Sequence, residues 1–148
     1  MSSDTSGINH DKDRGTIPDM SVDITREFRI ETDEIGWKPT SVEGLSEKHL
    51  WESPSGASIC LLRFEKGAGI GWRHRHASNQ FMFCLSGIYQ YTEGDITLRP
   101  GDFYMNPVGS EHGPTEALED AVLIEIYDGP HYLPGESVDE RLAERKGH

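Results

Sequence analysis

The stretch that decides the fold is Trp72-Arg73-His74-Arg75-His76-Ala77-Ser78-Asn79-Gln80. Alternate residues of an extended strand point to the same face of a sheet, so His74 and His76 can converge on one point. A third imidazole, His112, follows the turn Pro107-Val108-Gly109 later in the chain. We therefore predict that these three histidines, with the side-chain amide of Gln80, bind one divalent metal ion and that the chemistry takes place there.

Short strand-like runs, separated by glycine and proline, extend on both sides of this stretch. We predict strands over residues 24–30, 58–64, 70–76, 80–85, 88–92, 95–98, 102–106 and 121–127, with irregular chain over 37–51. Turn signals every ten residues or so indicate an antiparallel sandwich or barrel. No helical periodicity occurs before residues 137–146, which we predict to form one short helix or a polar tail.

The length of 148 residues allows one domain with a full core. We expect a flexible leader over residues 1–22, because this segment is polar and nearly free of apolar residues. The barrel should occupy residues 23–133, and a polar C-terminal tail should occupy residues 134–148.

Charge and composition exclude several classes of partner. The formal net charge of −12 argues against nucleic acid and against anionic membrane surfaces. No run approaches the roughly 20 apolar residues that cross a bilayer. The first residues lack the apolar core of a secretory signal, so we expect a cytoplasmic protein. Cys60 and Cys84 lie in strand-like apolar runs, where we expect them to be buried free thiols.

The first histidine segment resembles the first motif of the cupin superfamily, G-x5-H-x-H-x3,4-E-x6-G. His74, His76, Gln80 and Gly87 match its spacing. Two departures occur: Gln80 replaces the usual glutamate, and Ala68 occupies the position of the leading glycine.

The second histidine segment resembles the second cupin motif, G-x5-P-x-G-x2-H-x3-N. Gly101, Pro107, Gly109 and His112 match it at every spacing, with Glu116 where asparagine is usual. The resemblance covers residues 45–127 or so and implies an all-β double-stranded β-helix, the jelly-roll barrel. It also implies a metal inside the barrel, bound by the three histidines, with Gln80 as the usual fourth ligand.

The segments before the first motif, Trp37-Lys38-Pro39 and Leu61-Leu62-Arg63-Phe64, resemble the cupin group that contains dihydroxyacetophenone dioxygenase and the zinc-binding cupin domains of anti-sigma factors. At the ligand level it also resembles small cupin polyketide cyclases and hydroxynitrile lyases. We expect iron, as the dioxygenase resemblance implies. Zinc, nickel and manganese remain alternatives, because three imidazoles do not choose among these metals.

A glutamine ligand changes the chemistry expected of such a site. A glutamate would leave a net charge of +1 around a divalent ion, whereas Gln80 leaves +2, which favours an anionic chelating substrate such as an enolate. Gln80 cannot act as a general base. If a proton is abstracted, the base would be a metal-bound hydroxide, a carboxylate such as Glu111 or Glu116, or the substrate itself. His131 is a further catalytic candidate, as a fifth ligand or as an acid at the pocket mouth. The two glutamates could instead pair with surface arginines such as Arg63, Arg73 or Arg75, and His131 could belong to a loop after the last strand.

Strand alternation also predicts the substrate pocket. It points Trp72 and Met82 inward, and with Tyr89 and Tyr104 they are the candidate pocket-lining residues, with plain packing as the alternative.

The same alternation places Phe81, Phe83 and Leu85 on the outer face of the barrel. Large apolar side chains are costly in water, so this face should be covered by a second subunit or by the N-terminal strand. A homodimer is the favoured arrangement, because twofold dimers are the commonest oligomers.

Three functions remain open at this point. The first is an Fe(II) dioxygenase that cleaves a C–C bond of an enolisable small molecule. The second is a Lewis-acid isomerase, cyclase or lyase that uses zinc, nickel or manganese. The third is a non-catalytic sensor that binds a metal or a small ligand.

Overall fold

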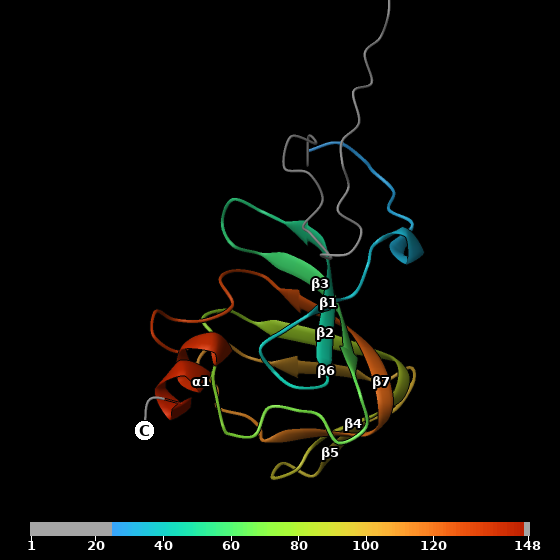
Figure 1. Ribbon diagram of the computed structural model, residues 1–148. Coiled ribbons are helices and arrows are strands. Elements are labelled where there is room, and N and C mark those ends of the chain that lie inside the picture. Colours follow the sequence, from blue (N-terminus) through green and yellow to red (C-terminus); the bar gives the residue numbers. More distant parts are fainter. Residues whose placement is uncertain (1–24, 147–148) are drawn as a thin grey trace, which may run out of the picture.

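The computed structural model describes residues 25–146, and its main feature is one strongly curved antiparallel sheet (Figure 1). The predicted leader over residues 1–22 lies outside the described residues. The strands are β1 Lys38–Pro39, β2 Leu45–Glu52, β3 Ser58–Phe64, β4 Gln80–Tyr91, β5 Ile96–Leu98, β6 Phe103–Asn106 and β7 Thr115–Tyr127. Their order is β1-β2-β3-β7-β4-β5, and β6 also pairs with β4. The all-β jelly-roll prediction is confirmed.

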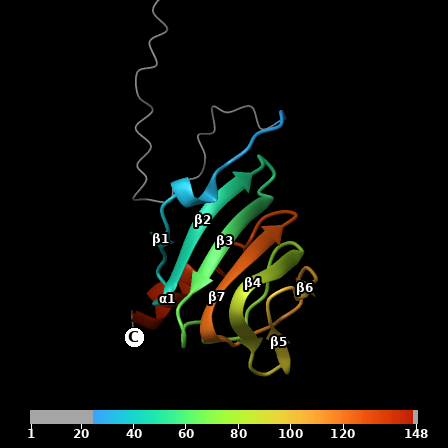
Figure 2. The same cartoon turned by 90° about the vertical axis from the view of Figure 1, so that its right-hand side faces the viewer.

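The sheet curls so that its two ends face each other. In Figure 2 the strands lie side by side from β1 and β2 through β3 and β7 to β4, while β5 and β6 form the opposite end. The concave side holds the apolar core, in which the Phe64 and Tyr89 rings lie 4.6 Å apart. Cys60 and Cys84 are buried free thiols, as predicted.

Alternation along β4 follows the predicted parity. Met82 and Cys84 are buried, whereas Phe83 and Leu85 are 41% and 44% exposed. Within residues 25–146, no segment covers this outer face.

Two predicted strands, 80–85 and 88–92, are one continuous strand with an irregularity between them. The pairing of β4 with β7 shifts register between Cys84 and Tyr89, around Gly87. A Cβ atom at Gly87 would lie 1.9 Å from the carbonyl oxygen of Asp120, and the residue has φ +74°. Only glycine fits here, and this motif position lets β4 and β7 approach closely.

The predicted edge strand over residues 24–30 is wrong. Residues 27–31 have no regular secondary structure and lead into a short 3-10 helix, η2 Thr32–Glu34.

The predicted irregular region 37–51 is also wrong, because it contains β1 and most of β2. Lys48 conceals the strand pattern, since it is buried on β2. Its ammonium group donates a 2.7 Å hydrogen bond to the carbonyl of Thr32 and lies 4.6 Å from the centre of the Trp37 ring. Its neighbours Glu47 and His49 line the cavity on the other face of β2, so polar residues lie on both faces and the alternation that predicts a strand is absent.

Two further boundaries differ from the prediction. Residues 70–76 form no regular strand. His74 and His112 form an isolated bridge, and the Ile70 carbonyl accepts a 2.9 Å hydrogen bond from the Thr115 amide of β7. Strand β7 begins at Thr115, six residues before the predicted start. The prediction relied on apolar residues, which are frequent only in the second half of this strand.

The C-terminal segment is helical, which confirms the helix alternative over the polar tail. Helix α1 spans Val138–Lys146. Ser137 caps it, since its Oγ accepts a 3.1 Å hydrogen bond from the Glu140 amide and donates one of 2.9 Å to the Glu140 carboxylate. Among the residues described, no helix is long and apolar enough to cross a membrane.

Candidate metal centre and its cavity

Three imidazoles come together where residues 70–76 meet the chain before β7. His74 and His112 exchange two backbone hydrogen bonds, each with a distance of 2.8 Å between the amide nitrogen and the carbonyl oxygen. His76 Nε2 lies 2.9 Å from His112 Nε2, and one ring nitrogen from each of the three histidines lies within 4.8 Å of the others. The predicted convergence of these side chains is confirmed.

Gly113 allows this close approach. A Cβ atom there would lie 2.7 Å from the Trp72 carbonyl oxygen and 3.2 Å from His74 Nδ1, and the residue has φ +91°. Any side chain would therefore separate the two segments that carry the histidines.

Each imidazole is oriented by a contact at its other nitrogen. His74 Nδ1 lies 3.2 Å from the Trp72 carbonyl, and His76 Nδ1 lies 3.2 Å from the His131 carbonyl. His112 Nδ1 lies 2.8 Å from the Tyr104 hydroxyl. With Nδ1 as the donor, the Nε2 lone pair of each ring is left for a metal, which is the usual arrangement of ligand histidines.

Burial keeps the cluster uncharged. It lowers the pKa of both His76 and His112 to about 3, and the neighbouring imidazoles add to the effect. It also lowers the pKa of His74. Neutral imidazole is the form that binds a metal.

Gln80 offers a further ligand atom beside the cluster. Its Nε2 donates 2.9 Å hydrogen bonds to Glu125 Oε2 and to the Tyr127 hydroxyl. Its Oε1 is buried and has no hydrogen-bond partner among the described residues. Such an orphaned acceptor costs about 1–3 kcal/mol, which a cation would offset. The donor set therefore fits a divalent metal ion.

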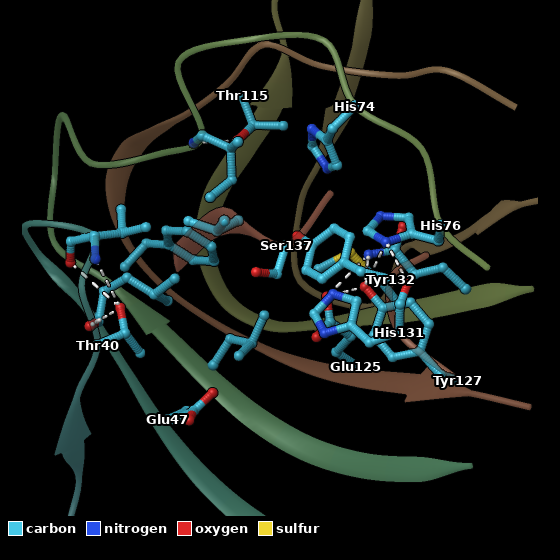
Figure 3. A pocket seen from close by; sticks show the side chains of 18 of the residues that line it. Thr40, Glu47, His74, His76, Thr115, Glu125, Tyr127, His131, Tyr132 and Ser137 are labelled. Carbon is cyan, nitrogen blue, oxygen red and sulfur yellow. Dashed lines mark hydrogen bonds between the residues drawn. The ribbon is translucent and has the colours of Figure 1, made fainter. Parts of the chain in front are cut away.

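A cavity of about 330 Å³ opens beside the histidines (Figure 3). His74, His76 and Gln80 form part of its wall, together with Met82 and Tyr89. Figure 3 shows Glu47 on the side opposite His74 and His76.

Two of the four predicted pocket residues do not line this cavity. Trp72 lies under α1, with the guanidinium groups of Arg141 and Arg145 at 5.3 and 4.4 Å from its ring centre. Tyr104 lies behind His112, which it orients. Strand alternation gave the wrong position for Trp72 because residues 70–76 do not form a regular strand.

The three predicted acid–base candidates occupy different places. Glu111 is exposed and pairs with Arg73 at 3.6 Å, which is the predicted surface alternative. Glu116 is exposed on β7, between the buried Thr115 and Ala117. Neither glutamate lines the cavity, whereas His131 does, with its ring 5.1 Å from that of His76.

The sequence patterns did not indicate Glu125, a carboxylate of the cavity wall that accepts a hydrogen bond from Gln80. Glu125 lines the cavity from β7, two residues from the buried Tyr127 and on the same face. Burial raises its pKa to about 7, and hydrogen bonds from Gln80 and Tyr127 limit the rise. Alternation from Leu123 to Tyr127 would have placed Glu125 inside.

The sequence model of the ChrR cupin-like domain matches residues 25–131. The chain belongs to the ChrR cupin-like family. No curated protein sequence matches it at a significant level. Among solved structures, KdgF from Halomonas sp. is similar at 26% identity, with a TM-score of 0.60 over 72% of this chain and 94% of that one.

Two other solved structures share the fold of this ChrR cupin-like protein. An acetylacetone dioxygenase from Acinetobacter johnsonii is 16% identical, with a TM-score of 0.61 over 82% of this chain and 91% of its own. The complex of SigE with the anti-sigma ChrR from Rhodobacter sphaeroides gives 20% identity and a TM-score of 0.53, over 68% of this chain and 52% of that one.

Proposed function

We propose that this ChrR cupin-like protein is a metal-dependent enzyme that acts on an enolisable small molecule with two neighbouring oxygen atoms. With iron(II), it would be a dioxygenase that cleaves a C–C bond. The observation that carries the proposal is the buried, neutral cluster of His74, His76 and His112 with a cavity beside it. The structural likeness to an acetylacetone dioxygenase supports the choice of reaction.

The three histidines would hold the ion, and Gln80 Oε1 would be the fourth protein ligand. A divalent ion there would supply Lewis acidity and, in the case of iron(II), reactivity towards oxygen. Because all four ligands are neutral, the site would attract an anionic chelating group.

The surrounding side chains would prepare the substrate. Glu125 is the carboxylate beside Gln80 and could accept the proton lost on enolisation. The rings of Tyr127, His131 and Tyr132 pack together at 3.9–4.1 Å and shield one wall from water.

Membership of the ChrR cupin-like family favours a second function, a sensor that binds a metal or a small ligand without turnover. The same cluster would serve both functions, so the experiment has to measure metal uptake and turnover separately.

The test begins with metal content. Untagged protein should contain close to one metal ion per chain, and His76→Ala should lose it. Arg75→Ala is the matched control, because Arg75 is the neighbour of His76 but its side chain lies on the surface, paired with Glu136 at 2.9 Å. Absence of metal in the native protein after reconstitution would disprove the proposal.

Oxygen uptake with 1,3-diketones and hydroxyketones then separates the functions. Uptake that matches substrate loss supports the dioxygenase. Turnover that continues without oxygen supports Lewis-acid catalysis instead. Metal uptake with no turnover of any compound supports the sensor.

A further inference from the structure

The inward side chains of the sheet make the two ends of the cavity chemically different. His49 pairs in register with Cys60, and Cys60 pairs with Glu125, so one row of inward positions is polar. Four residues earlier on β2, Leu45 pairs with Phe64. This second row is apolar, and it lies about 13 Å from the first along β2, at about 3.3 Å per residue.

The histidine cluster lies towards the polar end of the cavity. Gln80, which is the fourth candidate ligand, donates a hydrogen bond to Glu125 in the polar row. In Figure 3, Thr40 lies across the cavity from His76. Thr40 belongs to the turn between β1 and β2, and the same turn supplies Val42 to the cavity wall. The apolar end therefore lies away from His76.

Apolar side chains border unfilled space at this end. Phe64 and Ile70 are 2% and 8% exposed, yet both line the cavity together with Val42 and Leu45. The Tyr89 ring, whose centre lies 4.6 Å from that of Phe64, also lines it. Water in such a space finds few polar partners, whereas an apolar ligand group would restore the missing dispersion contacts. We call the four residues Val42, Leu45, Phe64 and Ile70 the apolar subsite.

The polar groups beside the apolar subsite are bonded within the protein. The Thr40 hydroxyl donates a 3.0 Å hydrogen bond to the Leu45 carbonyl, and the Thr115 hydroxyl accepts one of 2.8 Å from the Ile70 amide. Among the buried polar side-chain atoms of the described wall, only Gln80 Oε1 lacks a partner, and it belongs to the metal end. No lysine or arginine of the described chain lines the cavity.

Two carboxylates of the wall outside the apolar subsite also have protein partners. Glu47 Oε1 lies 2.9 Å from His49 Nε2, and Asp139 accepts a hydrogen bond from the Ser41 hydroxyl. A charged ligand group at the apolar end would lose hydration against side chains that cannot replace it. The end of a ligand that reaches this subsite should therefore be uncharged.

We propose that the apolar subsite holds an alkyl or aryl substituent of the substrate and selects the substrate by it. This inference rests on the proposed function, because the oxygens of the same molecule are taken to chelate the metal. The substrate class is then a diketone or hydroxyketone whose other end is apolar and uncharged. The substituent is small, since about 330 Å³ lies near the lower limit of ligand pockets. Sugar acids, amino acids and dicarboxylates are disfavoured, because their second polar end would be buried without a partner.

The test uses four hydroxamates, each of which chelates a divalent ion through the same two oxygens. Acetohydroxamate carries only a methyl group, and pentanohydroxamate carries a butyl chain. In 4-aminobutanohydroxamate and succinic monohydroxamate, a chain of similar length ends in an ammonium or a carboxylate group. Calorimetry on zinc-loaded protein gives the affinities without any turnover. We expect pentanohydroxamate to bind about tenfold or more tightly than acetohydroxamate, because each buried methylene contributes about a factor of four. Both charged compounds should bind more weakly than pentanohydroxamate.

Variants identify the residues responsible. Leu45→Asn places a polar group in the apolar subsite, and Val42→Phe fills the subsite. Each should bring the affinity ratio of pentanohydroxamate to acetohydroxamate close to one. Val42 is half-buried in a turn, so its variant should fold even if Leu45→Asn does not. Leu50→Asn is the matched control, because Leu50 belongs to the same strand but lines a different groove, and it should keep the native ratio.

The possible failures are distinguishable. Equal affinity of the native protein for pentanohydroxamate and acetohydroxamate would overturn this inference and leave the metal proposal intact, and so would tighter binding of either charged compound. A native ratio that persists in both Leu45→Asn and Val42→Phe would also overturn it. A protein that takes up no metal would overturn the proposed function and this inference with it.

Discussion

The amide of Gln80 shows how a single residue can be fixed in one orientation. Its nitrogen donates to two acceptors, and its buried oxygen receives no donor among the described residues, so Oε1 is left without a protein partner. The sequence predicted this residue from its spacing to His76. It did not predict Glu125 and Tyr127, which hold the amide, because they lie 45 and 47 residues further along the chain.

Tyr104 allows a test at the same scale. Tyr104→Phe removes the oxygen that lies 2.8 Å from His112 Nδ1. Because partners of this kind fix the ring and raise its basicity, metal affinity should fall about 10–100-fold. Competition with a chromogenic chelator measures the change.

Tyr132→Phe is the control, because the Tyr132 hydroxyl forms no hydrogen bond with the three histidines. Equal affinities of native protein and Tyr104→Phe would show that the hydroxyl has no role in metal binding.

At the scale of elements, the motif spacings predicted the barrel but not the exact strands. Gly87 and Gly113 were taken as turn or motif positions, whereas the structure uses both for close backbone contact. Strand β2 was missed because polar residues lie on both of its faces. Glu47 and His49 line the cavity, and Lys48 is buried on the opposite face, where Thr32 and Trp37 contact its ammonium group. Single-sequence patterns do not reveal such compensation, since it depends on residues brought together only by folding.

Gly113→Ala tests the close approach of the two histidine segments. The new methyl group would meet the Trp72 carbonyl at 2.7 Å in a backbone conformation with φ +91°. We expect a loss of about 1–3 kcal/mol in the free energy of unfolding, together with weaker metal binding. Urea denaturation of the metal-free protein and metal titration measure the two effects.

Gly71→Ala is the matched control. It lies on the same segment, and a Cβ atom there would have no neighbour within 4 Å. If both variants behave like the native protein, the approach does not depend on glycine.

At the scale of the whole molecule, burial of the histidine cluster links stability to pH. His76 and His112 are 1% and 8% exposed, and burial lowers the pKa of each to about 3 in the folded protein. The unfolded chain, with an ordinary histidine pKa of about 6.5, binds more protons in between. Stability is therefore complete above about pH 6.5 and is lost as the pH falls towards 3.

The metal-free protein should accordingly lose stability between pH 7 and pH 5. The loss is about 2 kcal/mol for each of the two histidines at most. Glu125 opposes it in part, because a pKa raised to about 7 makes its own contribution grow as the pH falls from 7 to 4.5. Urea denaturation at several pH values measures the slope. The double variant His76→Gln/His112→Gln should flatten it, and an unchanged slope would contradict this origin.

The prediction of a homodimer rests on the apolar outer face of the barrel. Phe83 pairs in register with Phe103, which is 62% exposed, and Phe81 pairs with Met105 and Ile126. These residues form one apolar surface that spans β4, β6 and β7, and a second copy of the chain would bury it.

Phe83→Asp should convert the dimer to a monomer in light scattering, because a charge at the centre of a buried apolar interface has no partner. Leu118→Asp, at an exposed apolar site outside the register pairs of this surface, is the control and should remain dimeric. A native chain that is monomeric at high concentration would contradict the prediction.

The contact between Trp72 and helix α1 has a practical consequence. The guanidinium groups of two α1 arginines lie 5.3 and 4.4 Å from the centre of the Trp72 ring, and the Trp72 carbonyl lies 3.2 Å from His74 Nδ1. Residues 137–139, at the start of the same helix, line the cavity. Any event that lifts α1 from the barrel would transfer the indole to water and move its emission to longer wavelength. The protein thus carries its own optical reporter of the state of the cavity entrance, and ligand entry can be timed by stopped flow without a label.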